Sequence, residues 1–206
     1  PVIKLHKGDL AANVGFGPSV AIDTETMGLN PHRDRLCVVQ LSAGDGTAHI
    51  VQILKGGPEP VRLKALLADE SVLKIFHYAR FDIAPLYNAL GVMTTPVYCT
   101  KIASKLSRTY TDRHGLKELA HEILGLELSK HQQSSDWGAA ELTQQQVAYA
   151  AHDVLHLHAI KAKLDALLAR EGREELAAAC FRFLPDRVRL DLAGVDIATD
   201  AAGRMY

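Results

Sequence analysis

The chain has 206 residues, of which 48% are hydrophobic and 23% are charged, and its formal net charge is −1. This composition is typical of a folded domain whose length allows a substantial core without disulfides or structural metals. The near-zero charge excludes the overall basic balance that marks many nucleic-acid-binding proteins, although a carboxylate-rich site can offset basic residues placed elsewhere.

The first half of the chain alternates strand-like and helix-like patterns. The predicted elements, in chain order, are strands at 19–23, 36–41 and 47–53, a helix at 61–67, a strand at 72–76, a helix at 80–90 and a short strand at 97–99. We expect the first three strands to form an antiparallel meander, because Asp45-Gly46 is a hairpin turn signal. The chain is therefore expected to open with this meander.

The second half is mostly helical. We expect a helix at 116–124, a long helix from Thr143 to about Arg170, and a last helix at 174–183 that ends before Pro185. Thr143 and Gln146 have the spacing of a capping box, which places the start of the long helix. Strands followed by interleaved strands and helices predict an α/β layer fold, and we expect one domain over 1–206.

The cysteines and the apolar runs bear on location. Cys37, Cys99 and Cys180 are far apart and lie in apolar stretches, so we expect small core residues rather than a metal cluster or a disulfide. We find neither the apolar region of a signal peptide nor a run of about 18 apolar residues. The expectation is a cytoplasmic protein with no membrane partner.

A pair of carboxylates ends the first predicted strand. Asp23 and Glu25 are two residues apart in a strand, so their side chains share a face. Two adjacent carboxylates repel unless a cation lies between them, and oxygen ligands favour Mg²⁺ or Mn²⁺ over zinc. The pair alone fits a strand end with two solvated acids equally well.

Two further acids follow later in the chain. Asp82 comes after the fourth predicted strand, where a lone acid usually serves as a helix-start residue. Tyr149 and Asp153 are four residues apart in the long predicted helix and so share a face. Small residues beside them, Ala148, Ala150 and Ala151, would allow this helix to lie close to a sheet.

The order of these groups resembles that of the DEDD exonucleases, in the subgroup with a tyrosine before the last aspartate. Residues 22–26, 77–82 and 149–153 match the three motifs of that family. The closer similarity is to ribonuclease D, and it is carried by residues 130–137 and 142–154. The resemblance extends over about 20–164, which leaves 172–206 as a C-terminal helix and tail.

The resemblance implies an RNase H-like (DnaQ-like) fold, with a mixed five-stranded sheet flanked by helices and a mostly helical C-terminal part. It implies that two divalent cations, Mg²⁺ or Mn²⁺, are held by Asp23, Glu25, Asp82 and Asp153. Tyr149 would orient the attacking water, because a free tyrosine has a pKa of about 10 and is a poor base. The activity expected is 3′–5′ hydrolysis to nucleoside 5′-monophosphates.

Substrate contacts are expected around the motifs and in one basic stretch, 101–117. Gly28 would allow backbone to approach a nucleotide, and Leu29 or Met27 would wedge between bases, although a core role fits them as well. The candidates are Thr26, Met27, Gly28, Leu29, His77, Tyr78, Arg80, Arg108, Arg113 and His114. The basic stretch is equally compatible with a solvated loop and helix face. For Trp137, the only tryptophan, we expect a core position rather than stacking on a base.

The short layout, with residues 109–117 after the fifth strand, resembles the nano-RNase C branch, and the accessory domains of ribonuclease D are not expected. That resemblance implies short single-stranded RNA substrates, down to dinucleotides, and a ring-like homo-octamer. The alternatives are trimming of longer RNA 3′ ends, a DNA exonuclease, and a catalytically inactive nucleic-acid-binding module. The complete carboxylate set favours an active enzyme.

Overall fold

The computed structural model describes residues 1–129 and 131–198. In this part of the chain the strands are β1 (Val2–Lys7), β2 (Ser19–Thr26), β3 (Leu36–Ser42), β4 (Thr47–Gln52), β5 (Leu73–Phe76) and β6 (Val97–Cys99). The helices are α1 (Val61–Ala68), α2 (Arg80–Leu90), α3 (Thr100–Ser107), α4 (Leu116–Leu124), α5 (Gln144–Leu155), α6 (Leu157–Glu171) and α7 (Glu174–Ala193). Two stretches named above reach past these limits: 130–137 begins at Lys130, and the tail includes 199–206.

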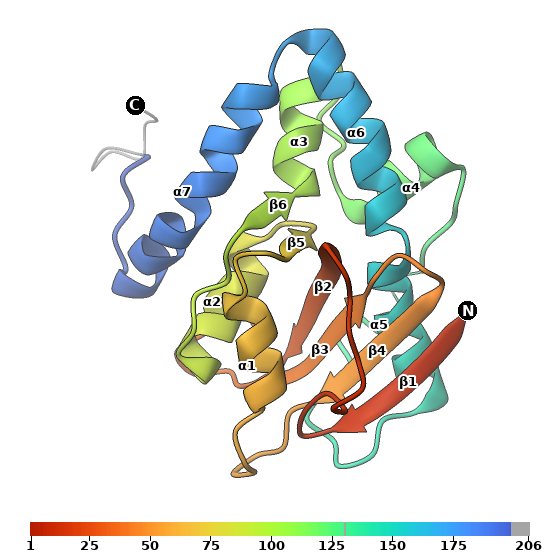
Figure 1. The fold of residues 1–206 in the computed structure, drawn as a ribbon, viewed down its shortest axis with the longest axis vertical. Coiled ribbons are helices and arrows are strands. Elements are labelled where there is room, and N and C mark those ends of the chain that lie inside the picture. Colours follow the sequence, from red (N-terminus) through yellow and green to blue (C-terminus); the bar gives the residue numbers. More distant parts are fainter. Residues whose placement is uncertain (130, 199–206) are drawn as a thin grey trace.

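The strands form one mixed sheet in the order β1-β4-β3-β2-β5-β6. Strands β2, β3 and β4 are antiparallel neighbours, which confirms the predicted meander. Strands β5 and β6 continue the sheet parallel to β2. Helices cover both faces, with α1 and α2 on one side and α5 on the other, while α3, α6 and α7 extend beyond one end of the sheet (Figure 1).

The prediction of a five-stranded sheet missed one strand. Strand β1 precedes the meander and pairs with β4 in parallel, so the sheet has six strands. Ile3 packs against the core, while Val2, Lys4 and Leu5 are exposed, as expected of a strand at the edge of the sheet. With so little of the strand buried, its sequence carries only a weak strand pattern, and the prediction overlooked it. The chain therefore opens with an edge strand rather than with the meander.

Three helical expectations also need correction. Helix α3 occupies a stretch for which no element was predicted. The long helix divides at His156 into α5, which packs on the sheet, and α6, which packs on α3 and α4. Helix α7 continues through Pro185 to Ala193, because Leu184 and Val188 are buried in the core and this burial offsets the hydrogen bond that proline removes.

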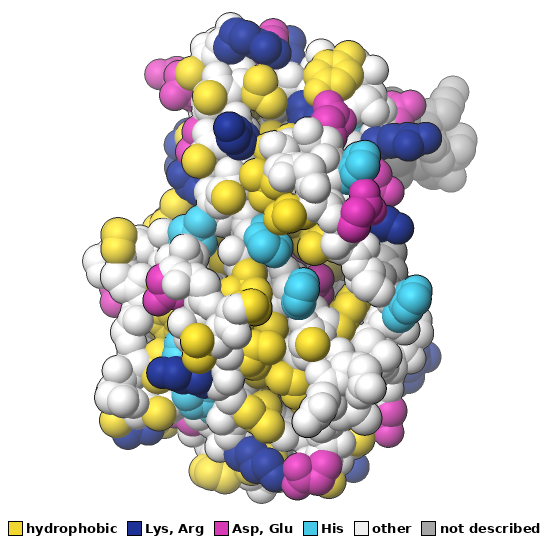
Figure 2. Space-filling view, turned by 90° about the vertical axis from the view of Figure 1, so that its right-hand side faces the viewer, with side chains coloured by type: hydrophobic (Ala, Val, Ile, Leu, Met, Phe, Trp, Pro, Cys, Tyr) yellow, Lys and Arg dark blue, Asp and Glu magenta, His cyan; other side chains and the backbone are white. Residues whose placement is uncertain are grey.

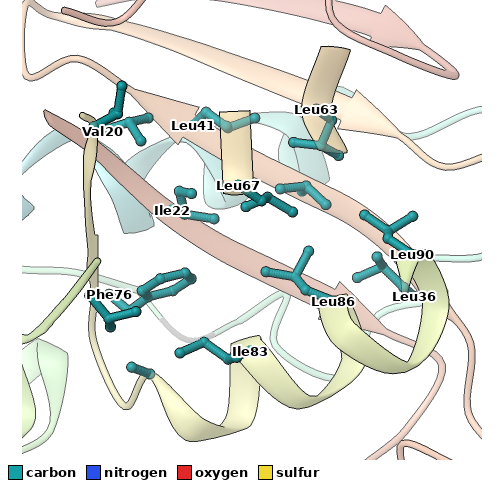
Figure 3. Packing of buried hydrophobic residues seen from close by; sticks show 14 of the residues in the cluster. Val20, Ile22, Leu36, Leu41, Leu63, Leu67, Phe76, Ile83, Leu86 and Leu90 are labelled. Atoms are coloured by element: carbon teal, nitrogen blue, oxygen red, sulfur yellow. The ribbon is translucent and has the colours of Figure 1, made fainter. Parts of the chain in front are cut away.

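Side chains of the central strands alternate between two hydrophobic clusters. Val20 and Ile22 of β2 pack with Leu63 and Leu67 of α1 and with Ile83 of α2 (Figure 3). Ala21 of β2 points to the other face, where the small residues of α5 pack. The same alternation sends Asp23 and Glu25 towards α5 and sends Thr24 towards α2.

The core also accounts for the cysteines and for the helix start. Cys37 and Cys99 are buried, Cys180 is half-buried, and all three are free thiols. The capping box at Thr143 and Gln146 is present at the start of α5. Within 1–129 and 131–198, the helices are too short or too polar to cross a bilayer.

Candidate active site

Three carboxylates from two elements meet on the α5 face of the sheet. Asp23 and Glu25 come from the end of β2, and Asp153 comes from the last turn of α5. One oxygen of each lies within 4.8 Å of the others. The meeting follows from the sequence, because residues 23 and 25 share a strand face and the alanines beside Asp153 let α5 lie against β3 and β4.

Asp82 reaches the site from the opposite face of the sheet. It lies in the first turn of α2, only 6% exposed, and its Oδ1 accepts a hydrogen bond from Thr24 Oγ1 at 2.7 Å. It interacts directly with Asp23 but is not among the three acids grouped within 4.8 Å. The structure thus brings the four predicted ligands into one region, with Asp82 set behind the other three.

Crowding disfavours the charged form of these acids. Burial raises the pKa of Asp23, and it raises those of Asp82 and Asp153 well above their usual range, with the Asp23 charge as the next cause for the latter two. Burial and the same charge raise the pKa of Glu25 to about 9. A hard divalent cation would relieve this repulsion, and an all-oxygen donor set fits Mg²⁺ or Mn²⁺.

Tyr149 lies one helical turn before Asp153 on α5. Burial, followed by the charges of Asp153 and Glu25, raises its pKa above the ordinary value, so the side chain stays a neutral phenol at physiological pH. Trp137 is 2% exposed, as expected for a core residue, and its ring lies 5.9 Å from the Tyr149 ring. The indole therefore packs beside the phenol from the core side.

A cavity of about 330 Å³ opens over these groups. Its volume is at the lower end of the range of small-ligand sites, which suits a few nucleotides better than a long groove. Asp23, Glu25, Tyr149 and Asp153 are among its lining residues. The other lining residues are Ile22, Thr24, His77, Tyr78, Lys101, Gly115, Leu116, Lys117, Leu128, Ser129, Gln133 and Leu157.

Two of the predicted substrate contacts, His77 and Tyr78, are in this cavity. They follow β5, whose carboxyl end meets the end of the parallel strand β2 at one edge of the sheet. Burial, followed by the charge of Lys101, lowers the pKa of His77 to about 3, so the imidazole is neutral. Tyr78 has a left-handed backbone at φ 66°, which is uncommon for a bulky residue and often found at functional sites.

Lys101 and Lys117 also line the cavity, although neither was singled out from the basic stretch. Lys101 Nζ lies 3.5 Å from the centre of the Tyr78 ring. It comes two residues after β6, so its place at the carboxyl edge of the sheet was the available signal. Among the described residues that line the cavity, these two lysines are the cations nearest to the expected position of a phosphate.

The segment after the first motif is placed beside the cavity rather than in its wall. Met27 is 53% exposed and Leu29 is 98% exposed, so neither is a core residue. Thr26 Oγ1 donates to the Gly28 carbonyl at 2.5 Å, and a Cβ added at Gly28 would collide with Asp34. A projecting Leu29 is compatible with the predicted wedge between bases.

The remaining predicted contacts do not line the cavity. Arg80 makes a two-bond ion pair with Asp191 of α7, from Nε at 3.0 Å and from Nη2 at 2.8 Å. Arg108 is fully buried and paired with Glu122, and its Nη1 donates to the Arg113 carbonyl at 2.9 Å.

His114 is buried and shares a hydrogen bond with Ser104 at 2.7 Å, and the Arg113 side chain is exposed. Arg108 and His114 therefore hold the connection between α3 and α4, and neither faces the carboxylates. On the face that Figure 2 shows, Lys and Arg side chains are scattered among acidic ones, while histidines gather near the middle. Basic and acidic side chains are thus mixed on that face, while the described basic residues that line the cavity are Lys101 and Lys117.

Comparisons with known proteins agree with this geometry. The profile of a family described as 3′–5′ exonuclease matches residues 8–169. Ribonuclease D of Gluconacetobacter diazotrophicus is 34% identical over 169 residues, which are 82% of this chain and 42% of that protein. The structure of Brucella melitensis NrnC with bound Mg²⁺ matches with a TM-score of 0.92 and 54% identity, covering 98% of this chain and 100% of that chain.

A second NrnC structure from that organism, bound to pGG, matches with a TM-score of 0.93 and 55% identity, covering 97% of this chain and 99% of that chain. The chain thus spans less than half the length of the curated ribonuclease D and nearly all of the solved NrnC chains.

Proposed function

Because this chain belongs to the 3′–5′ exonuclease family, we propose that it hydrolyses short RNA from the 3′ end, dinucleotides included, and releases nucleoside 5′-monophosphates. The mixed sheet with its flanking helices, together with the family match, confirms the RNase H-like exonuclease fold. The observation that carries the proposal is the grouping of Asp23, Glu25 and Asp153 beside Tyr149 in one cavity.

The proposed cofactors are two divalent cations, Mg²⁺ or Mn²⁺, held by the carboxylates of Asp23, Glu25, Asp82 and Asp153. Bound there, such a pair would stabilise charge at phosphorus and make hydroxide available near neutral pH. The chain's own residues do the rest: the carboxylates fix the cations, and the neutral Tyr149 phenol orients a water by hydrogen bonding. Lys101 and Lys117, which line the same cavity, would contact phosphate oxygens.

Two observations support a short substrate. The cavity is small, and the described basic residues that line it are two lysines, so only a few phosphates can be bound there. The similar Brucella melitensis protein was solved with pGG, a short oligonucleotide. The curated ribonuclease D relatives favour the second candidate, trimming of longer RNA 3′ ends, but this chain matches less than half of their length.

The test compares a 5′-labelled RNA dinucleotide with a long RNA and with a DNA of the same length, in Mn²⁺ and in Mg²⁺. We expect the dinucleotide to be cleaved fastest and to yield a 5′-monophosphate. Faster cleavage of the long RNA would favour 3′-end trimming, and faster cleavage of DNA would favour a DNA exonuclease. Binding without cleavage of any of them would indicate the inactive module.

We further propose that the chain forms a homo-oligomer, by resemblance an octameric ring. Exposed apolar side chains on α7, among them Leu176 at 57% and Phe183 at 42%, support a surface that another subunit covers. Light scattering after size exclusion tests this. A monomer at working concentration would contradict it without affecting the proposed chemistry.

A further inference from the structure

A buried glutamine contacts the carboxylates from the neighbouring strand. Gln40 of β3 is fully buried and lies directly opposite Asp23 in the antiparallel register of β2 and β3. Its Nε2 donates to Glu25 Oε1 at 3.1 Å and lies 3.5 Å from Asp23 Oδ2. One neutral amide group therefore touches two of the three acids that are grouped within 4.8 Å.

The orientation of this amide is fixed by its surroundings. The Gln40 Oε1 is buried without a hydrogen-bond partner, which is a costly arrangement for a polar atom. With the acids ionised, which is the form that binds cations, turning the amide over would set its oxygen against two carboxylates. The N–H donors must therefore face the acids, so the contact with Asp23 and Glu25 is the favourable interaction that Gln40 makes there.

We infer that Gln40 is a positioning residue, whose amide holds Asp23 and Glu25 in the arrangement in which they bind divalent cations. The inference rests on the proposed function, since it assigns a role within the same site. A carboxylate has two oxygens, so an amide on one of them steadies the group and leaves the other for a metal. Gln40 itself, as a neutral donor through N–H, is not a ligand.

A second glutamine provides a matched comparison on the same face of the sheet. Gln52 of β4 lies opposite Val38, two residues along β3 from Gln40, and is 4% exposed. Its Oε1 is also buried without a partner. Its Nε2, however, donates to the carbonyls of Ala139 and Ala140, both at 3.0 Å, and to no carboxylate. The two side chains thus differ in what their amides hold.

The experiment measures Mn²⁺ binding by calorimetry in Gln40→Met and in its control, Gln52→Met. Methionine keeps the length and volume of the side chain and removes the amide. We expect Mn²⁺ affinity to fall about 10–100-fold in Gln40→Met, the usual effect of removing a group that orients a metal ligand. We expect no change of Mn²⁺ affinity in Gln52→Met, and thermal unfolding without metal checks that both variants fold.

Hydrolysis of an RNA dinucleotide as a function of Mn²⁺ concentration gives the second readout. In Gln40→Met the curve should move to higher Mn²⁺, with most of the rate recovered at saturation, which a merely structural defect does not produce. Unchanged Mn²⁺ affinity in Gln40→Met, or an equal loss in Gln52→Met, overturns the inference. If either methionine variant fails to fold, Gln40→Asn and Gln52→Asn, whose shorter amides lose reach, carry the same comparison.

The wild-type protein separates this inference from the proposed function. Wild-type protein that binds Mn²⁺ and cleaves RNA upholds the proposed function, and the variants then decide the role of Gln40. Wild-type protein that binds Mn²⁺ but cleaves no nucleic acid contradicts the proposed function, while the calorimetric comparison still tests Gln40.

Discussion

Thr24 and Asp82 join the two faces of the sheet at the candidate active site. The hydroxyl of Thr24, between the two carboxylates of β2, donates to Asp82 Oδ1 at 2.7 Å on the α2 side. Strand alternation sends Thr24 to the face opposite Asp23 and Glu25, and α2 presents its first-turn acid there. This bond holds the fourth carboxylate on the α2 side, where it interacts with Asp23 but stays outside the group of three.

Replacing Thr24 by valine should weaken the site without unfolding the protein. The change keeps the β-branched shape and removes the donor, which leaves the buried Asp82 carboxylate without that hydrogen bond, at a cost of about 1–3 kcal/mol. We expect the rate of RNA dinucleotide hydrolysis to fall by about tenfold or more at fixed Mn²⁺. Thr24→Ser keeps the hydroxyl and should retain most of the activity; equal losses in both variants would argue against the hydrogen bond as the cause.

Replacing Asp153 by asparagine should separate stability from activity. The metal-free site holds several mutually repelling acids, so removing one charge should leave the melting temperature without metal unchanged or raised. Hydrolysis should be abolished, and the rise in melting temperature that Mn²⁺ gives the wild type should be lost, because that rise depends on binding affinity. Asp186 is an exposed acid on α7, and Asp186→Asn is the control. It should keep both the hydrolysis and the rise in melting temperature that Mn²⁺ gives.

Much of the fold could be predicted from local patterns. The meander, helix α2 and the short strand β6 follow from β-branched runs, the Asp45-Gly46 turn and Gly91 as a stop signal. Helix α7 could not be bounded, because the burial of Leu184 and Val188 is a tertiary effect that outweighs the local preference of Pro185. The division at His156 lacks a local signal, since neither glycine nor proline stands there.

The acidic residues of the candidate site could be predicted from the sequence, but the basic residues around them could not. Periodicity places Asp23 and Glu25 on one strand face, and Tyr149 and Asp153 on one helix face. A charge pattern, in contrast, does not reveal which cations already have partners. Arg80 and Arg108 were expected to meet phosphate, but they pair with Asp191 and Glu122, acids 111 and 14 residues further along the chain.

Arg80 should act on stability rather than on substrate binding. Its guanidinium makes two hydrogen bonds to Asp191 and so links α2 to α7, with both side chains more than two-thirds buried. Arg80→Gln should lower the free energy of unfolding by about 1 kcal/mol, as for a partly exposed ion pair, and leave KM for an RNA dinucleotide within about twofold. Lys101→Gln is the comparison, since Lys101 lines the cavity: there KM should rise. A large KM increase in Arg80→Gln would show instead that Arg80 contributes to substrate binding.

Tyr149→Phe should reduce the rate constant with little effect on metal binding. The phenol stays protonated because burial and the charges of Asp153 and Glu25 raise its pKa, so it acts as a hydrogen-bond donor that orients water. Loss of one such donor commonly costs about 10²-fold in kcat. Calorimetry should show unchanged Mn²⁺ affinity, while a loss of affinity would mean that the phenol supports the metal site instead. Tyr110→Phe, at a residue outside the cavity, controls for the substitution.

The neutral state of His77 should appear as a pH dependence of stability. Its Nδ1 shares a 2.8 Å hydrogen bond with Thr100 Oγ1, and the ring also makes a hydrogen bond with the backbone of His114. The pKa is lowered to about 3 in the folded protein from 6.5 in an unfolded chain. Between these values the unfolded state binds a proton that the folded state does not, so stability from this residue falls as pH decreases below about 6.5.

Chemical denaturation of wild type and His77→Gln tests this through the difference between the two proteins. Between about pH 7.5 and pH 5 the wild type should lose about 2 kcal/mol more than the variant, at 1.36 kcal/mol for each pH unit below 6.5. The carboxylates titrate in both proteins, so their contribution cancels in the difference. An NMR titration gives the direct reading, in which the His77 ring signals should not move until well below pH 5. Parallel stability curves, or a ring that titrates near 6.5, would show that His77 takes up a proton as freely in the cavity as in water.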